Sequence, residues 1–169
     1  MTDSFAQFPD SASVWAYALD RELTSDEVTT VTDILSRFLT NWQSHGTPVV
    51  GTFRLLENRF VLLGGYTNDG VSGCSTDSSV RVIKEIEQAL GVNAFDRSLV
   101  FFRNGGGKVV AVKRPDFQQM VNSGHVTPNT IVFDTTIHAI GDLRDGKFET
   151  TFDNSWHSRA FRRSSLESP

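Results

Sequence analysis

The sequence predicts an α+β fold: a largely antiparallel sheet built from hairpins, with two main helices and one short helix packed on it. Apolar residues recur at helical spacing over two long segments, near residues 25–44 and 76–90. Most other apolar segments come in pairs that are separated by short turn sequences, as is typical of antiparallel hairpins. Helices with one apolar face need a surface to pack on, so both patterns fit one architecture.

The chain begins with a short strand and a long helix. Large side chains alternate over Val14–Leu19, as expected for a strand with one buried face. A capping-box sequence follows, with Thr24 as the N-cap and Glu27 at the third helical position. Apolar residues then recur at helical spacing, and Gly46 marks the stop. We therefore expect a helix from about residue 25 to about residue 44.

Two hairpins are predicted from pairs of apolar segments that flank turn-forming residues. Asparagine and glycine tolerate the left-handed backbone conformations that tight turns require, and both hairpin turns contain at least one of them. The hairpins join residues 49–56 to 59–66 across Glu57-Asn58, and residues 98–103 to 108–113 across residues 104–107.

The remaining elements are a second helix, a third short helix and several short strands. The second helix is predicted from about residue 76 to residue 90, and Gly91 follows it as a left-handed C-terminal residue. Pro115 opens the third helix, which ends by Gly124. Short strands are expected over residues 130–133, 137–140 and 148–152.

Length and composition suit one folded domain. The chain has 169 residues, of which 38% are hydrophobic, enough for a substantial core. Its thirteen phenylalanines argue against disorder. No linker divides the sequence, so we expect a single globular α+β domain over residues 1–161 and a flexible polar tail over residues 162–169.

Charge and hydropathy exclude several classes of protein. The net charge of −4, with no Lys/Arg run in the body of the chain, is unfavourable for binding nucleic acid. The longest apolar run, Phe60–Gly65, is too short to cross a bilayer, and the N-terminus has no signal-peptide pattern. A lone cysteine fits a reducing compartment. We expect a cytoplasmic protein without nucleic acid or membrane insertion, and its oligomeric state stays open.

Metal and nucleotide motifs are missing. One cysteine excludes zinc sites built on several cysteines, and the four histidines form no HExxH pattern. The glycine run that ends at Gly107-Lys108 looks like the end of a Walker A motif. However, Phe102 occupies the position of its first glycine and Val109 that of its Ser/Thr. We therefore expect a plain hairpin turn, no metal and no cofactor.

The strongest candidate site is the polar segment before the second predicted helix. It places Cys74 beside Ser75, Asp77 and Ser78 at a helix N-terminus, where unpaired N–H groups favour anions and thiolates. The cysteine could also be a small buried residue in a tight turn. The hydroxyls could likewise cap the helix, and Asp77 in its first turn would be stabilised by the helix dipole.

A second candidate segment lies near the C-terminus, around Trp156, His157 and Arg159. Arg159 could hold a carboxylate or phosphate through its planar guanidinium, with His157 facing the same pocket. The alternative is that Trp156 and Phe161 simply dock the end of the chain.

Several phrases of the sequence, taken in order, carry a resemblance to a known family. They are Val14-Trp15-Ala16-Tyr17, Asn41-Trp42-Gln43-Ser44-His45-Gly46, Asn58-Arg59-Phe60, Ser72 to Val80, Thr130-Ile131-Val132-Phe133 and Ser155-Trp156-His157-Ser158-Arg159. The chain resembles, over about residues 12–161, a family of uncharacterised bacterial proteins found mainly in the Bacteroidetes. Members are sometimes labelled "ABC transporter ATPase", a label that the failed Walker A motif does not support. The resemblance implies a cytoplasmic single domain without an established activity.

These patterns lead to one main hypothesis and two alternatives. We expect the chain to bind a small polar or anionic ligand, or a partner protein, near the helix N-terminus at residues 73–79. Ser75, Asp77, Ser78, Trp156 and Arg159 are the candidate binding residues. The first alternative is a cysteine-dependent hydrolase or thiol transferase, with Cys74 as the nucleophile and His157 or His45 as the base. An ATPase, as the family label suggests, is the remote alternative.

Overall fold

A computed structural model of the chain describes residues 4–68 and 73–163, without the side chains of residues 73–75. The described chain divides into two compact units. Unit 1 contains the chain up to Phe95 together with Thr135–Asp145, and unit 2 contains Asp96–Asp134 together with the chain from Gly146 onward. The single domain over residues 1–161 stays a prediction, and most of the predicted tail lies outside the described residues.

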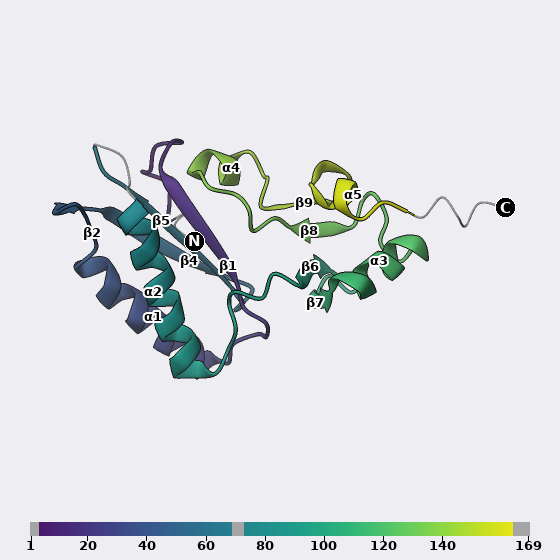
Figure 1. The fold of residues 1–169 in the computed structure, drawn as a ribbon, viewed down its shortest axis with the longest axis horizontal. Coiled ribbons are helices and arrows are strands. Elements are labelled where there is room, and N and C mark those ends of the chain that lie inside the picture. The colour runs from purple at the N-terminus through teal and green to yellow at the C-terminus, as the bar shows by residue number, and fades with distance from the viewer. Residues whose placement is uncertain (1–3, 69–72, 164–169) are drawn as a thin grey trace. The chain divides into compact units, whose positions relative to one another are not determined.

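The sheet of unit 1 has three antiparallel strands, in the order β1-β5-β4 (Figure 1). These are β1 (Ser13–Ala18), β4 (Val50–Leu56) and β5 (Phe60–Tyr66). The predicted hairpin between β4 and β5 is confirmed. Its turn residues Glu57 and Asn58 have φ angles of 56° and 51°. Two left-handed residues in succession match the twist of the paired strands.

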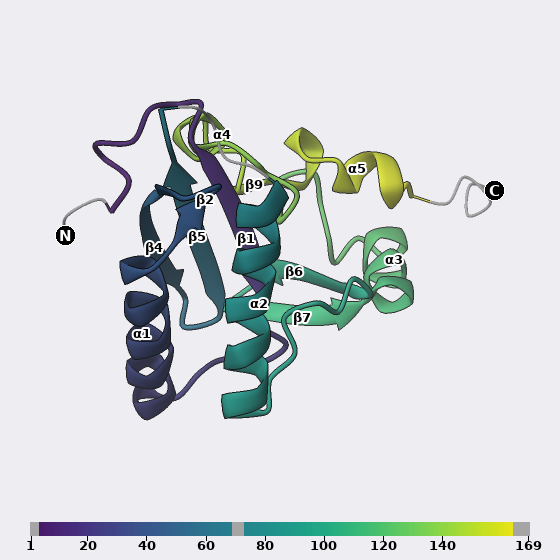
Figure 2. The same ribbon diagram turned by 60° about the vertical axis from the view of Figure 1, so that its left-hand side comes forward.

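Two long helices, α1 (Ser25–Thr40) and α2 (Gly73–Leu90), lie side by side on one face of this sheet (Figure 2). The predicted capping box is present at the start of α1. The Thr24 hydroxyl accepts a hydrogen bond from the Glu27 N–H at 3.2 Å, and the Glu27 carboxylate accepts one from the Thr24 N–H at 3.0 Å. Two of the unpaired donors at this helix end are thereby satisfied.

Helix α1 ends at Thr40, earlier than the predicted end near residue 44. The chain instead forms a small hairpin of β2 (Gln43–Ser44) and β3 (Thr47–Pro48). At its tip His45 and Gly46 have φ angles of 51° and 80°, which a helix cannot accommodate. Trp42 has the right spacing for the helix but lies beyond it.

Helix α2 begins at Gly73, earlier than the predicted start near residue 76. Its first turn therefore contains no acidic residue, and the prediction that Asp77 lies in that turn is wrong. The apolar faces of α1 and α2 close over the sheet in one core. Its members include Leu19, Val31, Leu35, Trp42, Leu63, Ile83 and Ile86.

The segment Thr135–Asp145 completes unit 1. A strand was predicted over residues 137–140, and only part of that prediction holds. Ala139 makes an isolated bridge to Ser13, after which the chain enters the short helix α4 (Ile140–Arg144). The Asp142 carboxylate accepts hydrogen bonds from the N–H groups of His138 and Ala139, both at 3.2 Å, so it caps this helix instead of letting the strand continue.

Unit 2 contains a four-stranded antiparallel sheet in the order β7-β6-β8-β9. Its elements are β6 (Leu99–Arg103), β7 (Val109–Lys113), α3 (Arg114–Asn122), β8 (Ile131–Phe133), β9 (Glu149–Thr151), a 3-10 turn (Phe152–Asn154) and α5 (His157–Ala160). The second hairpin and the helix opened by Pro115 are confirmed. The core centres on Phe117, which is fully buried.

The α+β class is confirmed, with the described strands divided among antiparallel sheets. Within the described ranges, none of the helices combines the length and the hydropathy that crossing a membrane would require.

Candidate functional site

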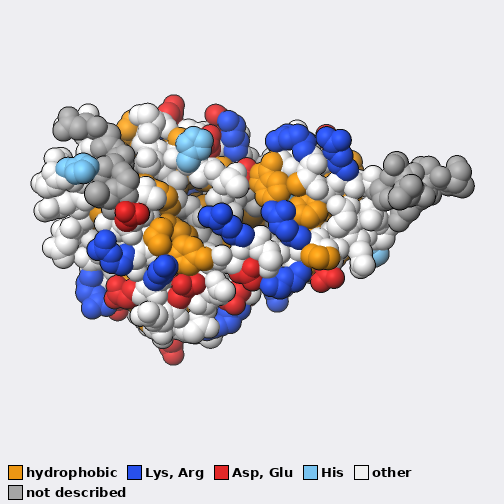
Figure 3. Space-filling view, in the orientation of Figure 1, with side chains coloured by type: hydrophobic (Ala, Val, Ile, Leu, Met, Phe, Trp, Pro, Cys, Tyr) orange, Lys and Arg blue, Asp and Glu red, His pale blue; other side chains and the backbone are white. Residues whose placement is uncertain are grey.

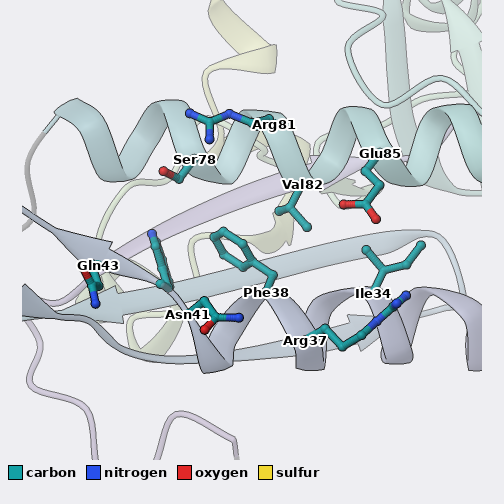
Figure 4. Close-up of a pocket in the computed structure, with 10 residues that line it drawn as sticks. Ile34, Arg37, Phe38, Asn41, Gln43, Ser78, Arg81, Val82 and Glu85 are labelled. Atoms are coloured by element: carbon teal, nitrogen blue, oxygen red, sulfur yellow. The ribbon is translucent and has the colours of Figure 1, made fainter. Parts of the chain in front are cut away.

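A groove of about 450 Å³ lies between α1 and α2 in unit 1 (Figure 4). It is lined by Ile34, Arg37, Phe38, Asn41, Trp42, Gln43, Ser78, Arg81, Val82 and Glu85. All of these residues belong to unit 1, so the groove is built by one compact unit.

The floor of the groove is apolar. Ile34 and Phe38 project from α1 toward α2, and Val82 projects from α2 toward α1 (Figure 4). Ile34 and Val82 are themselves buried, at 6% and 4% exposed, so the half-buried Phe38 is the more accessible of the three. Apolar floors of this kind supply binding energy in many small-molecule sites.

Trp42 also lines the groove and is 3% exposed. Its ring lies over Gly51 and Gly65: a Cβ atom at either glycine would come within 2.7 Å of the indole. The ring centroid lies 5.0 Å from that of Phe38. Among the described residues, the buried indole Nε1–H has no hydrogen-bond partner. An unmet buried donor costs about 1–3 kcal/mol, so a native protein normally has a reason to keep one.

Two arginines stand at the rim of the groove, Arg37 on α1 and Arg81 on α2. Both are exposed, and no ion pair within the described ranges involves either. Glu85 is the one acidic side chain in the described lining, which leaves the rim with a net positive charge. On the face drawn in Figure 3, basic and acidic side chains are interspersed.

The polar residues of the predicted helix-terminal site have separate positions. Ser78 is half-buried and lines the groove, whereas Asp77 is exposed on α2 and is absent from the described lining. Ser79, fully buried, donates a hydrogen bond to the Thr76 carbonyl at 2.7 Å and shares one of 2.8 Å with the Tyr17 hydroxyl. Burial raises the pKa of Tyr17, so this phenol stays protonated at neutral pH.

The backbone of Cys74 and Ser75 lies in the first turn of α2, but their side chains lie outside the described residues. His45 is exposed at the tip of the β2–β3 hairpin. The roles predicted for Cys74, Ser75 and His45 therefore stay predictions.

The C-terminal candidates lie in unit 2 and form an aromatic cluster. Trp156 stacks on His157 with ring centroids 4.0 Å apart, and its indole N–H donates to the Asp134 carboxylate at 3.1 Å. Arg114 lies over the Trp156 ring, 5.6 Å from its centroid. These contacts fit the alternative in which Trp156 and Phe161 dock the end of the chain. Arg159, by contrast, is exposed on α5.

His157 is 2% exposed and shares a buried hydrogen bond of 2.6 Å between its Nδ1 and the Ser155 hydroxyl. Burial lowers the pKa of His157 to about 4; nearby Asp134 opposes this shift and Arg114 adds to it. The imidazole is thus neutral at pH 7 and enclosed by its own unit, whereas Cys74 belongs to unit 1. The partnership of Cys74 with His157 stays a prediction.

In the described ranges, no group of three or more His, Cys, Asp or Glu residues is placed to hold a metal ion.

No family model, curated protein or solved structure matches this chain. The resemblance to a Bacteroidetes family therefore also stays a prediction.

Sequence reasoning missed Arg37, Arg81 and the groove that they border. A signal was available on α2: Ser78, Arg81, Val82 and Glu85 are spaced by three and four residues, which places them along one side of the helix. The facing residues of α1 could not be assigned to the same site without knowing that the two helices pair.

Proposed function

We propose that this chain binds a small organic anion with an apolar body in the groove between α1 and α2. The observation that supports this function is the pair of exposed arginines, Arg37 and Arg81, above an apolar floor and without ion-pair partners in the described ranges. Guanidinium groups bind carboxylates and phosphates through paired N–H donors.

The floor and the rim would act on different parts of the ligand. Phe38 and Val82 would contact its apolar body, and burying a modest apolar fragment is worth about 25 cal/mol per Å². Arg37 and Arg81 would hold its charged group, each worth about 1.5–3 kcal/mol for a hydrogen bond to a charge. Neither contribution alone would give useful affinity, since ordering the ligand costs free energy.

Neutral polar groups could select among ligands. Ser78, Asn41 and Gln43 line the same groove and offer a hydroxyl and two amides. In the described lining, Ser78 is the one residue that this groove shares with the site predicted at residues 73–79. The proposal therefore keeps the predicted ligand class and moves the site from the helix terminus to the space between the helices.

A titration with benzoate tests this function, with benzyl alcohol as the uncharged probe of similar shape. The readout is the set of amide and indole N–H signals in ¹H–¹⁵N spectra, with the Trp42 indole assigned from a Trp42→Phe spectrum. We expect benzoate to cause saturable shifts at α1, α2 and Trp42, and benzyl alcohol to bind at least about tenfold more weakly.

Matched variants on one helix separate a site from a general charge effect. Arg81→Gln is expected to weaken benzoate binding about tenfold, whereas Lys84→Gln, which removes an exposed charge of the same helix outside the described lining, should change it less than about twofold. Equal weakening by both variants, or shifts spread over both units, would contradict the proposal.

A cysteine-dependent enzyme and an ATPase stay the alternative functions. A protein partner, the cytoplasmic location and the absence of nucleic acid likewise stay predictions. Nothing in the described residues favours catalysis over binding.

A further inference from the structure

β1 is an edge strand, and part of its outer side is open. It pairs with β5 along its whole length, and among the described strands the sheet order β1-β5-β4 places none on its other side. Residues 138–140 cover only its beginning: the Val14 N–H donates to the His138 carbonyl at 3.1 Å, and the Ile140 N–H donates to the Ala12 carbonyl at 2.8 Å.

These bonds identify the main-chain groups that point outward. Within a strand, the N–H and C=O of alternate residues point to the same side. Because Val14 bonds outward to His138, the even-numbered residues of β1 face away from β5. At the other end the Asp20 N–H also bonds outward, to the Asn93 carbonyl at 3.0 Å. Between these two bonds lie the Val14 carbonyl and both main-chain groups of Ala16 and of Ala18.

No hydrogen bond within the described residues uses these five groups, and a groove of about 360 Å³ runs beside those of Val14 and Ala16. The groove is lined by five consecutive residues of β1, Ser13–Tyr17, together with Thr76, Thr135, Ile137 and His138. All of them belong to unit 1, and none of them is Asp, Glu, Lys or Arg.

Edge strands are normally protected against pairing by charged residues, proline or bulges. The sequence of β1, Ser13–Ala18, contains neither a charged residue nor a proline. The opposite edge strand β4 carries Arg54, whose guanidinium lies 5.0 Å from the centre of the Phe5 ring. The two edges of one sheet therefore differ, and the unprotected one borders the groove.

We propose that this edge of β1 binds an extended, uncharged peptide segment of a partner protein by strand addition. The peptide would run antiparallel to β1, in the direction already taken by residues 138–140. One of its residues would exchange both main-chain hydrogen bonds with Ala16, and the residues two positions before and after it would reach the main-chain groups of Ala18 and the Val14 carbonyl, respectively. About five residues fill this opening at about 3.3 Å per residue. The absence of Asp, Glu, Lys and Arg from the described lining favours uncharged peptides.

A second copy of the chain fits this edge poorly. If Ala16 of two copies paired about a two-fold axis, Leu19 of one copy would lie opposite Ser13 of the other. That position is already occupied by Ala139, which bridges Ser13. Leu19 is fully buried in its own unit and cannot turn away. A short peptide ends before it reaches Ser13, so it can occupy this edge without displacing Ala139.

The test is a selection from a random nonapeptide library displayed on phage against the full chain, followed by anisotropy measurements with the labelled winners. We expect uncharged sequences rich in β-branched residues. Ala16→Pro removes the central outward N–H and places a ring at the edge, so it should weaken their binding at least about tenfold. Ala16→Ser keeps the N–H and should bind within about twofold of the wild type.

Hydrogen exchange on the wild-type protein gives a readout that does not depend on the folding of a variant. Bound peptide is expected to slow exchange of the Ala16 and Ala18 amides and to leave β4 unchanged. Three results would overturn the proposal: no enriched peptide, binding without protection of these amides, or a concentration-dependent dimer that Ala16→Pro abolishes. The last would identify a second copy as the occupant. Benzoate binding in the groove between α1 and α2 is a separate measurement, so either proposal can fail alone.

Discussion

Tyr17 of β1 and Ser79 of α2 share a buried hydrogen bond of 2.8 Å, which joins the edge strand to the helix beside it. Ser79 also donates to the Thr76 carbonyl of its own helix. The two partners are therefore unequal, because the serine has a second partner and the phenol has none among the described hydrogen bonds.

This inequality predicts unequal losses of stability. Tyr17→Phe removes one hydrogen bond and leaves Ser79 its bond to Thr76, so it should lower the free energy of unfolding by about 1 kcal/mol. Ser79→Ala leaves a buried phenol unpaired and should cost about 2 kcal/mol. Urea denaturation measures both. Tyr66→Phe is the control, and a larger loss for Tyr17→Phe than for Ser79→Ala would contradict this explanation.

The close approach of Gly51 to Trp42 predicts a steric effect. A methyl group at residue 51 would lie 2.7 Å from Cε3 of the indole, a separation that forces the ring or the strand to move. Gly51→Ala should therefore destabilise the protein by about 1–3 kcal/mol and change the fluorescence of Trp42. Gly105→Ala is the matched control, because a Cβ atom there meets nothing within 4 Å. Equal melting temperatures for the two variants would show that the indole is loosely held.

Burial of His157 predicts a loss of stability in mild acid. Its pKa is about 4 in the folded protein, against about 6.5 in an unfolded chain. Above pH 6.5 the imidazole is neutral in both states and its contribution is complete. Between pH 6.5 and 4 only the unfolded state binds the proton, so stability falls as pH falls, by up to about 3 kcal/mol.

Urea denaturation at several pH values checks this dependence. His157→Phe should lose the slope between pH 6.5 and 4, although its stability at pH 7 will also change because Ser155 loses its partner. His125→Gln, at an exposed histidine, should keep the wild-type slope. If the variant keeps the wild-type slope, His157 binds its proton over the same pH range in the folded and in the unfolded protein.

The alternative of a cysteine-dependent enzyme makes its own prediction. A nucleophilic Cys74 must be exposed and ionised near neutral pH, so native protein should react rapidly with iodoacetamide, with a midpoint below about 8.5. The rate against pH, measured in native and in unfolded protein, tests this. Slow native reaction that becomes normal in urea would rule the enzyme out and leave the binding function in place.

Local signals explain which elements could be predicted from the sequence. The capping box at Thr24 and the turn at Glu57-Asn58 each depend on a few adjacent residues, and both were predicted correctly. The end of α1 was not, because Trp42 continues the apolar spacing while its indole is needed against Gly51. The contact that fixes Trp42 is made with Gly51, in a strand beyond the helix, and a pattern of neighbouring residues does not reveal it.

The candidate groove depends on even longer-range information. Arg37 and Arg81 look like ordinary solvated charges on two helices, and only the pairing of α1 with α2 brings them to one rim. His157 was predicted as a possible base for Cys74, a role that requires a tertiary contact between the two residues. Its ring is instead enclosed by aromatic residues, chiefly Trp156, Phe117 and Phe161, whose proximity depends on the fold of unit 2.

Unit 1 is not a continuous stretch of sequence, since Thr135–Asp145 returns to it after most of the strands of unit 2 have been traced. During synthesis on the ribosome, β1 emerges early, but the bond that Val14 donates to His138 and the bond that Ala12 accepts from Ile140 form only after residues 138–140 leave the exit tunnel. Its uncharged edge is therefore fully unpaired on its outer side throughout that interval. The nascent chain thus presents a longer unpaired edge before residue 140 appears than the folded unit does, and a chaperone would have more of that edge to protect at this stage.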